Sequence, residues 1–201
     1  MTMIRVLLLT VVVCGLACAA GRVDPSTLDQ KVLFGYQGWF DCPRKGAARG
    51  YSHWARGVPS AETLVIAMYP DLSEFDPADL CAVPGMTIGT KPAYLFSARN
   101  ANVVRRHFQW MKDYGLDGVF VQRFIGGTAR NQAEGDIVLR NVMAVAAETG
   151  RGFAIEYDIS GGKEATFARQ LQDDWRYLVD TVKVTAHPNY LHHQGKPVLS
   201  V

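Results

Sequence analysis

Apolar and polar positions follow two different periods along this chain. Between residues 100 and 114, large side chains recur at three- and four-residue steps, which stacks them on one face of a helix. They are Val104, His107, Phe108, Met111 and Tyr114. Asn100 or Asn102 can cap the start of this helix through a side-chain oxygen, and Gly115 suits a left-handed end. The pattern therefore predicts one amphipathic helix here.

Short apolar runs with a different pattern separate the helical stretches. One of them, Val119-Phe120-Val121, is apolar on both faces, as is typical of a buried parallel strand. These runs are residues 32–39, 119–124, 153–159 and 198–201. Helical spacing returns over residues 133–149 and again from Phe167 to Val182. Strands that alternate with helices in this way predict right-handed crossovers and a parallel sheet.

Residues 41–96 do not follow that alternation. Proline and glycine indicate a loop over residues 41–60, after which the run Thr63–Tyr69 predicts a further strand. A proline- and glycine-rich stretch then extends to Pro92, before a short strand at Ala93–Phe96. We expect this segment to be an elaborated excursion without a hydrophobic core of its own.

The predicted fold class is α/β, with the strand and helix order of a (β/α)8 TIM barrel. The core strands are too few to close a barrel, and a complete barrel typically takes about 250 residues, whereas this chain has 201. The sequence contains no glycine fingerprint of a nucleotide-binding fold. We predict that residues 20–201 form only the N-terminal half of a barrel, truncated at the C-terminus.

Charge and composition narrow the classes of ligand. The net charge is +2, and the basic residues are scattered apart from the pair Arg105-Arg106, so we expect no nucleic-acid partner. His187, His192 and His193 lie near proline and glycine without a set of partners spaced for metal binding. We therefore expect neither a metal site nor another cofactor.

Residues 1–19 have the pattern of a secretory signal peptide. Arg5 precedes an apolar run, and Ala17-Cys18-Ala19 supplies a cleavage site of small residues. The run is too short to be an integral membrane span. We expect a secreted or periplasmic protein, and a lipid anchor at Cys18 is the alternative.

Cleavage of that segment leaves Cys42 and Cys81 as the cysteines of the mature chain. In an exported protein these two residues can form one disulfide. Two separate thiols are an equally open interpretation.

Polar residues at the ends of the predicted strands indicate where a catalytic or ligand-binding site lies. Gln122 and Arg123 end one predicted strand, and ligands bind at the carboxyl ends of parallel strands. On the next strand, Glu156 and Asp158 are two residues apart and project to the same side. They are candidates for acid/base chemistry or for binding hydroxyl groups. The alternative is a structural carboxylate paired with Arg123 on the adjacent strand.

Aromatic residues near the first strand are candidates for sugar binding. Tyr36, Trp39 and Trp54 can form a platform on which the apolar face of a sugar ring packs. Packing in the core is the alternative for these rings. His53, next to Trp54 in the loop, is a candidate ligand contact.

These residues resemble those of glycoside hydrolase families 71 and 99, in particular the bacterial 71/99-like proteins sometimes labelled xylosidase/arabinosidase. The matching pieces span most of residues 31–201, and their order and spacing carry the resemblance. The pieces are Gly35-Tyr36-Gln37-Gly38-Trp39-Phe40, His53-Trp54, residues 68–77, residues 114–124, Ile155-Glu156-Tyr157-Asp158 and Gly195-Lys196-Pro197-Val198.

The resemblance implies an exported (β/α)8 glycosidase-like fold that acts on a polysaccharide or glycan. It implies that the substrate-side residues are Tyr36, Trp39, His53, Trp54, Gln122, Arg123, Glu156 and Asp158. In family 99 the catalytic carboxylates lie in an Asn-Glu-Trp-x-x-Glu-like motif on a late strand, and this chain contains no such motif. The principal acid and base would then be absent from it.

The sequence as a whole predicts a glycoside hydrolase-like protein, an O-glycosyl hydrolase in its full-length form. Glu156 and Asp158 are the catalytic candidates within this chain, since hydrolysis of a glycosidic bond uses two carboxyl groups. The alternative is a glycan-binding protein, or an inactive product, without turnover.

Overall fold

The structure is a computed structural model that describes residues 21–43, 50–163 and 165–201. The predicted signal peptide, including Cys18, lies outside the described residues. No helix in the described part of the chain combines the length and the apolar character needed to cross a membrane.

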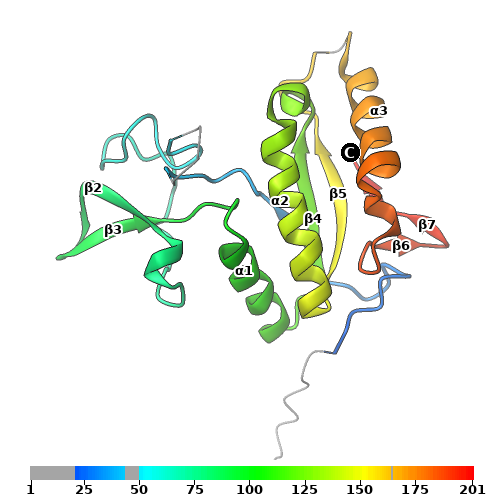
Figure 1. Ribbon diagram of the computed structural model, residues 1–201, viewed down its shortest axis with the longest axis horizontal. Helices are drawn as coiled ribbons and strands as arrows, with labels where there is room; N and C mark the ends of the chain where they lie inside the picture. Colours follow the sequence, from blue (N-terminus) through cyan, green and yellow to red (C-terminus); the bar gives the residue numbers. More distant parts are fainter. Residues whose placement is uncertain (1–20, 44–49, 164) are drawn as a thin grey trace, which may run out of the picture.

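Four parallel strands form the central sheet (Figure 1). Their order across the sheet is β1 (Leu33–Tyr36), β4 (Gly118–Phe124), β5 (Gly152–Asp158) and β8 (Leu199–Ser200). The predicted alternation of strands and helices with parallel pairing is therefore confirmed. The pairing sets Gln122 beside Glu156 and Phe124 beside Asp158, so polar groups from two strands meet near the carboxyl end of the sheet.

Three helices connect these strands: α1 (Ala101–Asp113), α2 (Thr128–Thr149) and α3 (Phe167–Tyr177). The other helical elements of the described residues are a π-helical turn at Leu178–Val182 and 3-10 turns at Pro77–Asp79, Ile125–Gly127 and Val184–Ala186. A short antiparallel pair, β6 (His192–His193) and β7 (Lys196–Pro197), precedes β8.

The start of α1 settles the choice between two predicted caps. The side-chain oxygen of Asn100 accepts the backbone N–H of Asn102 at 3.0 Å, so Asn100 is the cap. Gly115 follows the end of this helix with a φ of 71°, the left-handed conformation that glycine adopts at low cost.

The main core lies between one face of the sheet and the helices. Val119 and Val121 of β4 and Phe153, Ile155 and Tyr157 of β5 point to this face and are almost completely buried. Because side chains alternate along a strand, the residues between them point to the opposite face. On that face Gln122, Phe124, Glu156 and Asp158 are only partly buried.

The excursion, residues 41–96, differs from its prediction. Thr63–Tyr69 is not a strand, and Leu64 makes only an isolated bridge to Ala55. The regular strands are β2 (Cys81–Ile88), which was not predicted, and β3 (Lys91–Leu95), which confirms the short strand predicted at Ala93–Phe96; the two form an antiparallel hairpin. The pairing is irregular between Ala82 and Thr87, where an exposed edge tolerates a proline and a glycine that disguise the strand in the sequence.

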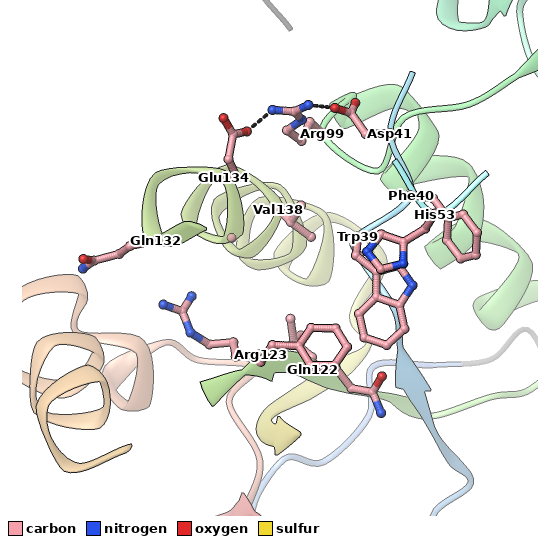
Figure 2. A pocket seen from close by; sticks show the side chains of 14 residues that line it. Trp39, Phe40, Asp41, His53, Arg99, Gln122, Arg123, Gln132, Glu134 and Val138 are labelled. Atoms are coloured by element: carbon pink, nitrogen blue, oxygen red, sulfur yellow. Dashed lines mark hydrogen bonds and ion pairs between the residues drawn. The ribbon is translucent and has the colours of Figure 1, made fainter. Parts of the chain in front are cut away.

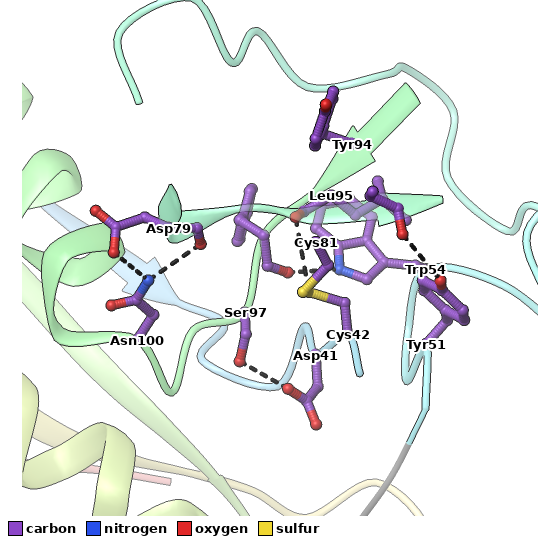
Figure 3. The surroundings of a disulfide bond; sticks show 12 residues. Asp41, Cys42, Tyr51, Trp54, Asp79, Cys81, Tyr94, Leu95, Ser97 and Asn100 are labelled. Carbon is purple, nitrogen blue, oxygen red and sulfur yellow. Dashed lines mark hydrogen bonds between the residues drawn. A yellow bond between two sulfur atoms is a disulfide. The ribbon is translucent and has the colours of Figure 1, made fainter. Parts of the chain in front are cut away.

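The excursion also has a hydrophobic cluster of its own, so the expectation that it lacks a core is wrong. The cluster consists of Cys42, Trp54, Cys81, Val83, Ala93 and Leu95. Cys42 and Cys81 form a disulfide with their Cα atoms 6.2 Å apart, which decides between the two interpretations of these cysteines (Figure 3). This cross-link ties the segment after β1 to the hairpin.

Candidate functional site

A cavity of about 120 Å³ lies beyond the carboxyl ends of β1 and β4, against the N-terminal half of α2 (Figure 2). The candidates Trp39, His53, Gln122 and Arg123 all line it. The structure thus brings together four residues that are up to 84 positions apart in the sequence, between Trp39 and Arg123.

One wall of this cavity is aromatic. The ring of Trp39 stacks on Phe124, with centroids 4.5 Å apart, and on His53, with centroids 5.3 Å apart. Phe124 is two residues beyond Gln122 on the same face of β4, so the aromatic wall continues into the polar strand ends. Sequence reasoning found Trp39 and His53 but missed Phe124, because an aromatic residue in a strand is most often packing.

The other wall is charged, and it was not predicted. Figure 2 shows Arg99 between Asp41 and Glu134, and its guanidinium group forms an ion pair with each carboxylate. The hydroxyl of Ser97 donates to Asp41 at 2.6 Å, which completes the partners of that buried carboxylate. These residues come from segments far apart in the sequence and share no motif, so no sequence signal would have grouped them.

Arg123 occupies the floor of the cavity and is fully engaged on the helix side of the sheet. Its Nε and Nη2 groups donate to Asp174 of α3 at 2.8 and 2.6 Å, and Nη1 donates to Asp136 of α2 at 3.2 Å. The interpretation that Arg123 pairs with Glu156 or Asp158 is therefore wrong. The physical reason is the alternation of the strand, which sends Arg123 and its register partner Tyr157 to the face opposite those carboxylates.

Tyrosines complete this buried charge network. The hydroxyl of Tyr157 donates to Asp174 and that of Tyr177 donates to Asp136, each at 2.6 Å. Burial alone would lower the pKa of Arg123, but the hydrogen bonds and charges of Asp174 and Asp136 raise it. Burial and the neighbouring Asp174 carboxylate raise the pKa of Tyr157. Arg123 is therefore a permanent cation, already neutralised by two carboxylates.

The open face of the sheet carries a separate polar pair. Gln122 Nε2 donates to Glu156 Oε2 at 2.8 Å. A side-chain carbon placed on Gly35 of the neighbouring strand would lie 3.2 Å from Gln122 Nε2 and 3.6 Å from Glu156 Oε2. Glycine at this position therefore leaves room for a ligand to approach the pair. Asp158, on the same face, accepts the backbone N–H of Ser160 at 2.7 Å through Oδ1 and so also shapes the turn after β5.

Tyr36 and Trp54 do not line the cavity. Trp54 is 3% exposed in the cluster of the excursion, and its indole N–H donates to the carbonyl of Phe96 at 2.9 Å. Tyr36 is 8% exposed, and its hydroxyl forms a hydrogen bond of 2.9 Å with Nδ1 of His107. Burial lowers the pKa of His107 to about 4, so this histidine is neutral at physiological pH. Both rings pack in buried clusters, in agreement with the packing interpretation, and their role at the substrate stays a prediction.

Within the described residues, no group of three or more histidine, cysteine, aspartate or glutamate side chains is arranged to hold a metal ion. The side chains that line the cavity offer apolar ring faces, an amide and carboxylates.

Comparison with known proteins adds information on the fold. No family model matches this sequence, and no curated protein sequence matches it. The structure is similar to that of the GH99 endo-alpha-mannosidase from Bacteroides thetaiotaomicron in complex with bis-tris propane, with a TM-score of 0.57 and 16% identity. A second structure of a GH99 endo-alpha-mannosidase from the same organism gives the same TM-score and identity.

The chain has the fold of part of a glycosidase TIM barrel. It covers 42% and 45% of those two chains, while 87% and 86% of its own length is matched. The predicted α/β class and half-barrel arrangement are thus confirmed. At 16% identity the similarity concerns the fold and says nothing of which residues act.

Proposed function

We propose that this chain is a glycoside hydrolase-like protein that binds a glycan at the carboxyl ends of β1, β4 and β5. The observation that carries this proposal is the Trp39–Phe124 stack beside the Gln122–Glu156 pair. An apolar ring face next to oriented polar groups is the usual make-up of a pocket for a small polar ligand. The barrel fold supports it, because active sites of such barrels lie at this end of the strands.

In this arrangement a sugar ring packs its apolar face against the aromatic wall formed by Trp39, Phe124 and His53, and its hydroxyl groups hydrogen-bond to Gln122 and to Glu156 beside it. The hydrogen bond between Gln122 and Glu156 fixes the orientation of both side chains before the ligand arrives. Such preorganisation reduces the entropy that a ligand must lose for the contact to form. Arg123 supports this site from the helix side and is not assigned a direct contact with the ligand.

Catalysis by Glu156 and Asp158 is the finer part of the proposal. Glycoside hydrolysis needs two carboxyl groups that flank the scissile bond, about 5–5.5 Å apart in retaining and about 6.5–9.5 Å apart in inverting enzymes. Glu156 and Asp158 lie on one face of one strand, and each accepts a hydrogen bond from a neighbouring protein group. Neither residue lines the cavity itself, which supports the second candidate function, glycan binding without turnover by these residues. The resemblance to family 99 likewise implies an acid and a base on a later strand.

The substrate class and the compartment are also proposals. The structural neighbours are endo-alpha-mannosidases, which supports α-linked mannose as the first glycan to test, with xylose- and arabinose-containing glycans second on the sequence resemblance. The Cys42–Cys81 disulfide supports an oxidising compartment, as expected for a secreted or periplasmic protein, with or without a lipid on Cys18.

Calorimetric titration with α-linked mannooligosaccharides and with xylan- and arabinan-derived oligosaccharides tests the proposal. We expect one class to bind, and the substitution Trp39→Ala to weaken that binding by at least about tenfold, the scale of a lost aromatic contact. Tyr114→Ala is the matched control, because this aromatic side chain is 76% exposed at the end of α1. Chromatography of the same mixtures reports turnover. If none of the three glycan classes bound, the proposal would fail.

A further inference from the structure

Two dipeptides divide their rings between the cavity and the core of the excursion. In Trp39-Phe40 and in His53-Trp54, the first ring lines the cavity and the second packs in or against the buried cluster, although Phe40 also borders the cavity. The two cavity rings stack on one another at 5.3 Å, and the two core rings contact at 4.4 Å. The four rings thus form two contacting aromatic pairs, one at the cavity and one at the buried cluster.

The backbone holds the two segments in this arrangement. The N–H of Asp41 donates to the carbonyl of Ser52 at 3.0 Å, which joins the chain directly after one dipeptide to the residue directly before the other. Trp54 is anchored by its indole hydrogen bond to Phe96. Because its neighbour Trp54 is fixed, the position of His53 is determined by the core.

His53 itself has an unusual backbone. Its φ is 62°, in the left-handed region that is uncommon for residues other than glycine, although asparagine, aspartate and histidine are enriched there. Such conformations persist where the surrounding structure enforces them, and they cluster at functional sites. Here the left-handed turn directs an imidazole onto the indole of Trp39, and it does so while Trp54 points into the core.

We propose that His53 is a positioning residue for Trp39. Its ring packs on the indole and holds it in the plane in which it stacks on Phe124, so the cavity presents a preformed apolar wall. The benefit to sugar binding rests on the proposed function, but the positioning of Trp39 does not require a ligand. This role replaces the direct ligand contact that the sequence predicts for His53.

Three substitutions separate the ring of His53 from its backbone. His53→Asn removes the ring but keeps a residue that tolerates the left-handed conformation, and His53→Gly removes the ring and the strain together. His53→Phe restores an aromatic ring without a titratable group. All three are made in the full chain, and thermal unfolding shows that each variant is folded.

The first measurement needs no ligand. In a ¹⁵N–¹H spectrum the indole N–H resonance of Trp39, assigned with Trp39→Phe, should broaden or move in His53→Asn and His53→Gly and return in His53→Phe. The resonance of Trp54 should stay in place, and the melting temperature of His53→Gly should equal or exceed that of the unmodified chain. An unchanged Trp39 resonance in both ring-deleted variants would show that His53 is only a turn residue.

The second measurement is the affinity for an α-linked mannooligosaccharide. We expect His53→Asn and His53→Gly to bind about tenfold more weakly, and His53→Phe to recover most of the affinity. Lost affinity with an undisturbed Trp39 resonance would mean that His53 contacts the sugar directly, which overturns the positioning role. If the unmodified chain bound no sugar, the proposed function would fail, while the Trp39 resonance would still decide the role of His53.

Discussion

The parallel sheet and the excursion of residues 41–96 are stabilised in different ways. In the sheet, consecutive strands and helices bury a continuous core that includes Val119, Phe153 and Ile155. The excursion buries a small cluster instead, and the Cys42–Cys81 disulfide closes it. Successive strand-helix units bury enough apolar side chains against one another to be stable, whereas a short irregular segment needs a covalent constraint to remain ordered.

The candidate site lies where these two regions meet. Trp39 follows β1, Asp41 and His53 belong to the excursion, and Gln122 and Phe124 end a sheet strand. Damage to the sheet should therefore unfold the whole chain. Damage to the excursion should disturb the site and leave most of the sheet intact. Substitutions placed in one region or the other test this difference.

Removal of Arg123 should cause the largest loss of stability, because it leaves Asp136 and Asp174 buried without their cation. We expect Arg123→Met to lower the free energy of unfolding by about 3–5 kcal/mol, the usual cost of breaking a buried ion pair from one side. Urea titration followed by circular dichroism measures it. Arg176→Met is the control, since its ion pair with Asp173 on α3 is exposed and contributes little. Equal transitions for the two variants would contradict this role.

The sequence predicted the sheet better than the excursion, and the reason is physical. An apolar run such as that of β4 is buried wherever it folds, so its pattern alone indicates a strand. The hairpin depends on pairing between Cys81–Ile88 and Lys91–Leu95, and on a disulfide to a residue 39 positions away. Proline and glycine in β2 mask its period, and long-range partners leave no local signal.

The candidate site was also predicted only in part, because local patterns can be seen in the sequence and long-range partners cannot. Strand-end residues such as Gln122 and Glu156 are found from alternation and position. The side of the sheet that Arg123 faces was accessible from the same alternation, but its partners Asp136 and Asp174 on two different helices were not. The Arg99 ion pairs with Asp41 and Glu134 likewise exist only after three separate segments meet.

Loss of the disulfide should affect the excursion and the adjoining segment after β1, and leave the sheet intact. We expect the double substitution Cys42→Ser with Cys81→Ser to lower the free energy of unfolding by about 2–4 kcal/mol. The reason is that the unfolded segment regains the conformational entropy that the cross-link removes. Hydrogen exchange should accelerate in β2 and β3 and in the segment that carries Trp39, while β4 and β5 keep their protection. Uniformly faster exchange across both regions would show that they unfold as one unit.

Acid should loosen the contact between the two regions through His107. This α1 residue packs against Phe75 and Phe96 of the excursion, at centroid distances of 5.8 and 5.2 Å. Burial lowers its pKa from 6.5 to about 4, so between these values the unfolded chain binds more protons than the folded one. Neutral His107 therefore makes its full contribution to the free energy of unfolding above pH 6.5. That contribution decreases by up to about 3 kcal/mol as the pH falls toward 4.

Unfolding experiments at a series of pH values test the role of His107. Replacement by asparagine keeps a polar acceptor near Nδ1 for the Tyr36 hydroxyl but cannot titrate in this range. We expect His107→Asn to flatten the decline in stability between pH 6.5 and 4. His187→Asn is the comparison, because the pKa of His187 is also lowered by burial but this residue packs on Phe153 in the sheet. A decline that persists in His107→Asn and disappears in His187→Asn would place the acid-sensitive group in the sheet.

Asn100 gives the smallest and most local test, because it joins the excursion to α1 with one side chain. Its oxygen caps the helix, and its amide nitrogen donates to the backbone carbonyl of Asp79 at 3.0 Å and to the Asp79 carboxylate at 2.8 Å (Figure 3). Asn100→Ala should lower the free energy of unfolding by about 1–2 kcal/mol, since both functions are lost. Asn100→Ser keeps a capping oxygen and loses the donors to Asp79, so the difference between the two variants isolates the cap.

If the two regions are coupled through this residue, Asn100→Ser should increase hydrogen exchange around Pro77–Asp79 while α1 stays protected. Faster exchange in α1 instead would show that the helix depends on its contacts with the excursion and not on its cap.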